Sequence, residues 1–172
     1  RSNLGMRILK KRLNYLVETT ENSIPQNEAV LEALRKESPG AAALAHYMHR
    51  TGCYPVYDHT EVKYYPLGED KWADLLQALE QAEHFIFLEY FIIDEGLMWG
   101  RVLEILAEKA KAGVDVRVMY DGTCEFSTLP HDYPKRLQAL GIKCKMFAPM
   151  TPFVSTHYNY RDHRKIAVID GH

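Results

Sequence analysis

A histidine, a lysine and an aspartate near the end of the chain have the types and spacing of a phosphoryl-transfer site. His163 and Lys165 are two residues apart, and Asp170 follows in the same segment. Residues two apart in a β-strand project from the same face, so the imidazole and the ammonium group are expected to point into one site. A neutral imidazole is a competent nucleophile, and a lysine supplies a fixed positive charge for phosphate oxygens. The pair therefore suits phosphoryl transfer without a metal.

Two carboxylates accompany this pair. Asp170 and Gly171 predict a turn that ends the strand, where the carboxylate can bond to nearby backbone or basic groups. Glu89 interrupts an otherwise apolar stretch, and burial of its charge is costly unless the carboxylate has a partner. We expect Glu89 to line the same site and to orient a histidine. An edge position in contact with water is the equal alternative.

The elements that must position these residues are strands alternating with helices. Apolar runs predict strands over 85–93, 114–120, 142–147 and 164–169. Helical spacing predicts a helix before the first strand, capped by Asp70, and two helices between later strands: one that Gly113 stops and a short one over 133–140. This order predicts an α/β fold with a largely parallel or mixed sheet flanked by helices. The nearly continuous apolar run over 85–93 further predicts a strand covered on both faces.

The N-terminal part has a different pattern. Residues 1 to about 40 predict helices, the second of which begins at Asn27 as N-cap and stops before Ser38. Residues 56–57 and 62–65 predict a short hairpin. The chain therefore divides into a helical part over 1–50 and an α/β part over 51–172.

Composition excludes several classes of protein. The chain has 172 residues and a formal net charge of −2, so no global positive field favours nucleic-acid binding. Its three cysteines, Cys53, Cys124 and Cys144, are widely spaced, which indicates reduced thiols and excludes a zinc ribbon. No membrane span is predicted, because the longest apolar run, 85–93, is far shorter than the ~18 residues that a spanning helix needs. We expect neither a metal nor a cofactor.

Several segments, taken together, resemble one known family. The segment NYRDHRKIAVIDG (159–171) resembles the first catalytic H-x-K-x4-D motif of the phospholipase D superfamily, most closely that of bacterial cardiolipin synthases. Residues 87–93, 109–121 and 140–143 resemble further segments of that family in the same order. The resemblance runs from about Pro55 to Gly171, whereas residues 1 to about 50 match only weakly.

The resemblance implies a reaction and residue roles. Family enzymes transfer a phosphatidyl group through a phosphohistidine, and cardiolipin synthases join two phosphatidylglycerol molecules with release of glycerol. Carried onto this chain, His163 is the expected nucleophile and Lys165 the phosphate clamp. Asp170 is the acid of the motif, with a role more structural than proton-transferring, and Asn159 is expected to help bind phosphate.

The resemblance also implies an organisation. Residues 1–50 then correspond to a juxtamembrane helical connector, and residues 51–172 to the first phospholipase D-like catalytic half, truncated just after its motif. A second half or a second copy must complete the site, so we expect these residues alone to be soluble and to lack transferase activity. The complete protein is expected at the cytoplasmic side of a bacterial membrane, attached through the rest of its chain or through the basic N-terminal helix. Its substrate is expected to be an anionic phospholipid.

Two other interpretations stay open. The chain could belong to another phospholipase D-type phosphodiesterase or nuclease that uses the same histidine chemistry, although its net charge speaks against nucleic acid. It could also be a non-catalytic half-domain that serves as a scaffold. The intact His163 and Lys165 pair argues against loss of activity.

Overall fold

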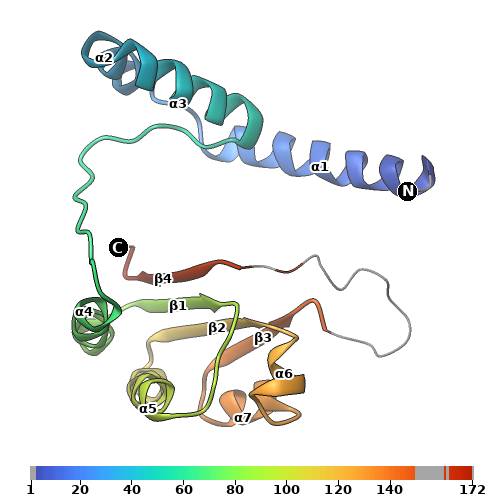
Figure 1. The fold of residues 1–172 in the computed structure, drawn as a ribbon, viewed down its shortest axis with the longest axis vertical. Helices are drawn as coiled ribbons and strands as arrows, with labels where there is room; N and C mark the ends of the chain where they lie inside the picture. The colour runs from blue at the N-terminus through green and yellow to red at the C-terminus, as the bar shows by residue number, and fades with distance from the viewer. Residues whose placement is uncertain (1–2, 150–160, 162, 172) are drawn as a thin grey trace. The chain divides into compact units, whose positions relative to one another are not determined.

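A computed structural model describes residues 3–149, 161 and 163–171 of the chain. The chain divides into two compact units, residues 1–64 and residues 65–172. The first unit is helical and the second contains the sheet (Figure 1). Among the described residues, every helix is too short or too polar to cross a lipid bilayer.

The N-terminal unit contains helices α1 (Asn3–Ser23), α2 (Glu28–Glu37) and α3 (Pro39–Gly52). The predicted cap of α2 is confirmed, because the Asn27 side-chain oxygen accepts a hydrogen bond from the Ala29 backbone N–H at 3.0 Å. Ser38 ends α2 and caps α3. Cys53, in the left-handed conformation, ends α3.

The predicted hairpin over residues 56–57 and 62–65 is wrong. The structure has no strand between α3 and the following helix. Val62 and Tyr64, which produced the alternating pattern, are 87% and 84% exposed. An isolated two-stranded hairpin is only marginally stable in water, so alternation without a buried face does not specify one.

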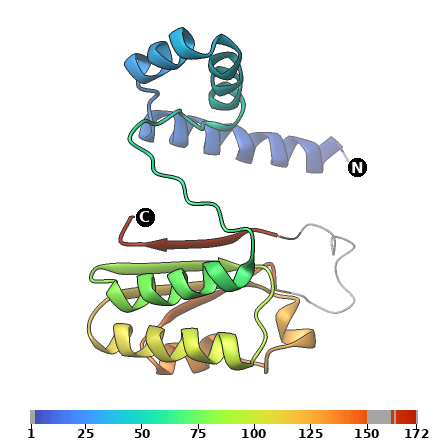
Figure 2. The ribbon, with the colours of Figure 1, turned by 60° about the vertical axis from the view of Figure 1, so that its left-hand side comes forward.

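The C-terminal unit is an open four-stranded mixed sheet with helices, which confirms the predicted fold class (Figure 2). The strand order is β3-β2-β1-β4, where β1 pairs in parallel with β2, β2 in parallel with β3, and β4 antiparallel with β1. The strands are β1 (Phe85–Tyr90), β2 (Asp115–Asp121), β3 (Lys143–Phe147) and β4 (Lys165–Ile169). The helices are α4 (Gly68–Gln81), α5 (Leu97–Lys111), α6 (Cys124–Ser127) and α7 (Tyr133–Ala139).

The hydrophobic core of this unit lies on one face of the sheet. Alternate strand residues such as Ile86, Val116 and Cys144 pack with Leu79 of α4 and Leu106 of α5 in a single buried cluster. The predicted N-cap of α4 at Asp70 is wrong by three residues: the N-cap is Leu67, the helix begins at Gly68, and Asp70 lies in its first turn. Cys53, Cys124 and Cys144 are free and buried.

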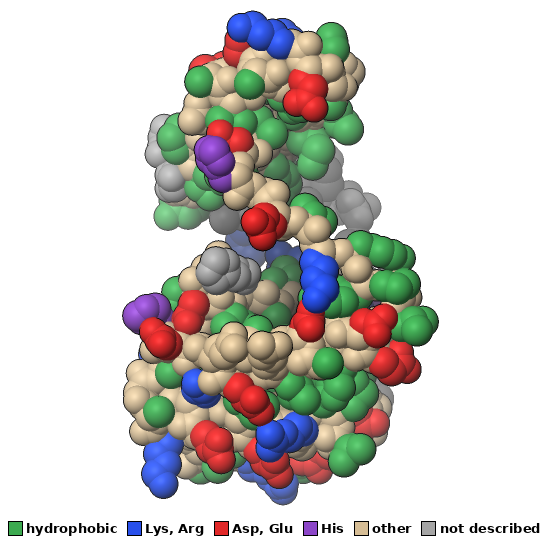
Figure 3. All heavy atoms as spheres, turned by 90° about the vertical axis from the view of Figure 1, so that its left-hand side faces the viewer, with side chains coloured by type: hydrophobic (Ala, Val, Ile, Leu, Met, Phe, Trp, Pro, Cys, Tyr) green, Lys and Arg blue, Asp and Glu red, His purple; other side chains and the backbone are tan. Residues whose placement is uncertain are grey.

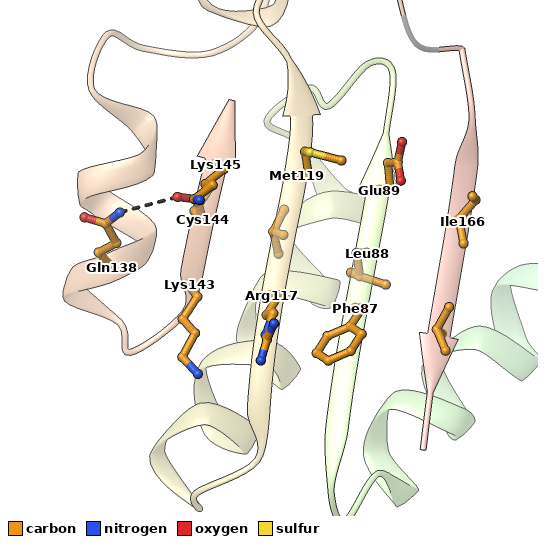
Figure 4. Close-up of a pocket in the computed structure, with 12 residues that line it drawn as sticks. Phe87, Leu88, Glu89, Arg117, Met119, Gln138, Lys143, Cys144, Lys145 and Ile166 are labelled. Atoms are coloured by element: carbon orange, nitrogen blue, oxygen red, sulfur yellow. Dashed lines mark hydrogen bonds between the residues drawn. The ribbon is translucent and has the colours of Figure 1, made fainter. Parts of the chain in front are cut away.

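The other face of the sheet is less buried than the sequence predicts. In β1, Ile86 and Leu88 are buried, whereas Phe85, Phe87 and Glu89 are only half-buried, so the expected cover on both faces is wrong for the described chain. Figure 4 shows Lys143, Arg117 and Phe87 in one row across β3, β2 and β1, and Lys145, Met119, Glu89 and Ile166 in the next. These rows line an open cavity of about 810 Å³.

Acidic and basic side chains are intermixed on the view of the surface in Figure 3. This agrees with the formal net charge of −2. Any affinity for an anionic group must therefore come from a local arrangement of charges rather than from a global field.

The ends of β2 and β3 approach each other closely at Gly122. The Gly122 N–H donates to the Phe147 carbonyl at 2.8 Å. A Cβ at Gly122 would lie 2.7 Å from the Ala148 carbonyl oxygen and 3.0 Å from the Pro149 Cα, and both are backbone atoms. Glycine is therefore required for close backbone approach at this position.

Gly122→Ala is expected to destabilise the C-terminal unit by about 1–3 kcal/mol, because the backbone must shift to accept the methyl group. Gly100→Ala in α5 is the matched control: a Cβ there meets nothing within 4 Å, so it should be neutral or stabilising. Urea unfolding followed by tryptophan fluorescence measures both, because Trp72 and Trp99 lie in this unit. Equal stability of Gly122→Ala and the parent chain would contradict the close approach.

Candidate active site

The carboxyl ends of the three parallel strands lie at one edge of the sheet, and β4 begins at that same edge. Tyr90 at the end of β1 lies opposite Tyr120 of β2 on one side and Lys165 of β4 on the other. α/β proteins place their ligand contacts outside the carboxyl ends of parallel strands. This edge is therefore the candidate site.

His163 and Lys165 meet at a shared aromatic ring. The His163 imidazole stacks on Phe91 with ring centroids 3.9 Å apart and an interplanar angle of 19°. The Lys165 Nζ lies 5.2 Å from the centroid of the same ring and donates to the His163 carbonyl oxygen at 2.6 Å. Both residues are exposed. An imidazole and an ammonium group thus lie against the same phenylalanine ring at this edge.

Glu89 has an ion-pair partner in the same segment. Its Oε1 lies 3.0 Å from Nη2 of Arg164, and the Glu89 side chain is 20% exposed. Arg164 directly precedes Lys165 in the chain, so this pair also ties β4 to β1. The proposed role of Glu89 in orienting a histidine stays a prediction, since the partner found here is a guanidinium group.

Asp170 lies at the opposite end of β4. Its carboxylate accepts hydrogen bonds from three successive backbone N–H groups at the start of β1, those of Glu83, His84 and Phe85, at 2.7, 2.9 and 2.8 Å. These bonds, foremost those from Glu83 and Phe85, lower the pKa of Asp170 from 3.8 to about 2. β4 separates Asp170 from Lys165, so the structure brings together His163 and Lys165 but holds Asp170 apart from them.

The structure adds a residue pair that sequence reasoning missed. Asp121, 1% exposed at the end of β2, forms an ion pair with Nη1 of Arg161 at 3.3 Å. The available signal was a carboxylate at the end of an apolar strand, but nothing local identified its partner. Asn159, the predicted phosphate-binding residue, lies outside the described residues.

Several bacterial proteins are similar to this chain in sequence. No protein-family model matches the chain. An uncharacterized protein of Streptococcus mutans is 51% identical over 97% of this chain. Cardiolipin synthases of Alkalihalophilus pseudofirmus and Halalkalibacterium halodurans are each 38% identical over 81% of it.

These matches confirm the resemblance predicted from the sequence. Over most of its length the chain is similar to curated cardiolipin synthases, consistent with a relationship to the phospholipase D superfamily. The chain spans 36% of the length of the Streptococcus relative and 28% of the length of the two cardiolipin synthases.

The Asp170 hydrogen bonds predict a pH-dependent contribution to stability. The pKa of Asp170 is lower in the folded chain than its ordinary value of 3.8, so the carboxylate stabilises the fold above pH 4 and this contribution disappears as the pH falls toward 2. Asp170→Asn should therefore be less stable than the parent chain at pH 6, with a difference that shrinks as the pH falls below 4.

Urea unfolding at pH 6 and at pH 3 tests this expectation. Asp94→Asn serves as control, because the Asp94 side chain is exposed and no hydrogen bond of its side chain is among those described. A difference between Asp170→Asn and the parent that stays constant over this pH range would show that the carboxylate charge is unimportant.

Proposed function

We propose that the complete protein carrying these residues is a phospholipase D-type phosphatidyltransferase that makes cardiolipin. It would join two phosphatidylglycerol molecules and release glycerol. The observation that carries this proposal is the placement of His163 and Lys165 on one aromatic ring at the carboxyl edge of the sheet. The similarity to proteins named cardiolipin synthase supports the choice of substrate.

The proposed reaction has two displacement steps at phosphorus. A neutral His163 ring nitrogen attacks the phosphodiester of one phosphatidylglycerol, forming an N–P bond while the P–O bond to the headgroup glycerol breaks. A general acid from a second catalytic motif protonates the departing glycerol oxygen. The headgroup hydroxyl of a second phosphatidylglycerol then loses its proton to that group and attacks phosphorus, which breaks the N–P bond and releases His163.

The neighbouring residues have supporting roles in this proposal. Lys165 neutralises the phosphate oxygens as negative charge develops on them. Its present hydrogen bond to the His163 carbonyl keeps its Nζ near the nucleophile. Asp170 acts structurally, by fixing β4 to the start of β1. Asn159 would add a phosphate contact, and Glu89 would hold Arg164 at the edge of the site.

The proposal requires parts beyond these residues. A second catalytic motif, from a second half or a second copy of the chain, must supply the general acid, so residues 1–172 alone should not form cardiolipin. Residues 1–50 would serve as a connector near the membrane. Arg7, Lys10, Lys11 and Arg12 of α1 are exposed alongside Ile8 and Leu13, a combination that supports contact with an anionic lipid surface.

His163→Ala in the complete gene product is expected to lower the rate of cardiolipin formation from phosphatidylglycerol by more than about a thousandfold, because the nucleophile is lost. His59→Ala is the control, since the His59 side chain is 93% exposed in the loop between α3 and α4. Thin-layer separation of labelled lipid products measures both rates. Unchanged synthesis by His163→Ala would refute the proposed function.

Lys165→Met is expected to lower kcat by about 10²–10³-fold, because a methionine fills the same space without the charge that stabilises the phosphorus transition state. Lys165→Arg should retain part of the activity, since a guanidinium also binds phosphate oxygens. Steady-state kinetics on phosphatidylglycerol vesicles compare the two variants. Equal kcat for Lys165→Met and the parent would exclude a role of this charge in the reaction.

A further inference from the structure

The segment that leads into the candidate site is held by a buried guanidinium group. Arg161, whose side chain is 9% exposed, lies two residues before His163. Its Nη1 donates to the Ala148 carbonyl oxygen at 2.7 Å and to the Asp121 Oδ1 at 3.3 Å. The guanidinium therefore links three parts of the chain: the end of β2, the end of β3 and the entry to β4.

Besides the ion pair with Arg161, local hydrogen bonds hold the Asp121 carboxylate at the end of β2. Its Oδ1 also accepts hydrogen bonds from the Thr123 backbone N–H at 2.9 Å and from the Thr123 hydroxyl at 2.8 Å. Its Oδ2 is buried with no hydrogen-bond partner in the described part of the chain. Burying a carboxylate with one oxygen that accepts no hydrogen bond costs free energy. The positive charge of Arg161 offsets this cost.

The backbone around this ion pair is close-packed and locally strained. Ala148 has a φ of +44°, a left-handed conformation that is costly for alanine. Its carbonyl oxygen is the atom that a Cβ at Gly122 would meet at 2.7 Å. Backbone strain of this kind persists only where the surrounding contacts over-determine it, and it is common at functional sites.

We propose that Asp121 is a positioning residue for the reaction, acting through its buried ion pair with Arg161 to fix the backbone that carries His163 and Lys165. The inference rests on the proposed role of His163. Two residues of extended chain span at most about 7 Å, so an anchored Arg161 restricts where the His163 imidazole can lie. Buried ion pairs add little net stability compared with apolar residues, which makes a geometric role the better explanation of this pair.

The test measures kcat and KM for cardiolipin formation by the complete gene product. Asp121→Asn keeps the shape of the side chain but removes its charge, and is expected to lower kcat by about 10–100-fold with KM changed by less than about threefold, as a displaced nucleophile predicts. Asp115→Asn is the matched control at the other end of β2. Asp115 also forms ion pairs, with Arg117 and Lys143, but lies far from the site edge, so kcat should stay within about twofold.

Variants of Arg161 test the same ion pair even if the Asp121→Asn protein does not fold. Arg161→Gln should reduce kcat as Asp121→Asn does, and Arg161→Lys should recover part of that loss, because a lysine restores the charge without the planar fork. The double variant Asp121→Asn with Arg161→Gln should be no slower than the slower single variant, since both break one link.

The outcomes separate this proposal from the proposed function. Folded Asp121→Asn and Arg161→Gln with kcat within twofold of the parent, beside an inactive His163→Ala, would overturn the positioning role alone. An active His163→Ala would overturn the proposed function whatever the Asp121 variants do. If Asp121→Asn is unfolded by circular dichroism, equal kcat for Arg161→Gln, Arg161→Lys and the parent overturns the positioning role.

Discussion

The antiparallel pairing of β4 with β1 is the interaction on which the candidate site depends, because it brings His163 and Lys165 back to the carboxyl edge of the parallel strands. Asp170 fixes one end of this pairing through three backbone N–H groups at the start of β1. The Tyr90 to Lys165 register fixes the other end. A strand has a side-chain period of two, so a shift of one residue would turn Lys165 away from Phe91. Asp170 thus helps to fix the position of β4 from the end opposite Lys165.

The charges at this edge are arranged in pairs rather than as a broad positive field. Arg161 is matched by Asp121, and Arg164 by Glu89, while the Lys165 ammonium group lies over Phe91 with the His163 imidazole. The two arginines then serve mainly to hold the backbone, and Lys165 is the cation best placed to meet a phosphate. In a chain whose net charge is −2, the anionic headgroup of the proposed substrate would be bound through this local geometry rather than through a global field.

Sequence patterns predicted the parts of this structure that local chemistry determines. The Asn27 cap depends on neighbouring residues, and the α/β class follows from the order of the predicted strands and helices. That His163 and Lys165 share one face of a strand stays a prediction, because β4 begins only at Lys165. The pattern over 56–65 failed because alternation predicts a strand only where a sheet buries one face, and Val62 is exposed. Glu89, Asp121 and Asp170 each have a partner about 40 to 90 residues away along the chain. These partners meet only when β4 pairs with β1, so no local sequence pattern identifies them.

Trapping the covalent intermediate tests most directly whether His163 is the nucleophile. Complete gene product would be mixed with phosphatidylglycerol labelled with ³²P in its phosphate, quenched with alkali within one turnover, and digested for peptide mapping. We expect an alkali-stable, acid-labile label on the peptide that contains His163, and none on that peptide in the His163→Ala variant. A label that maps to any other residue, with His163 unmodified throughout turnover, would contradict His163 as the nucleophile that β4 presents to the substrate.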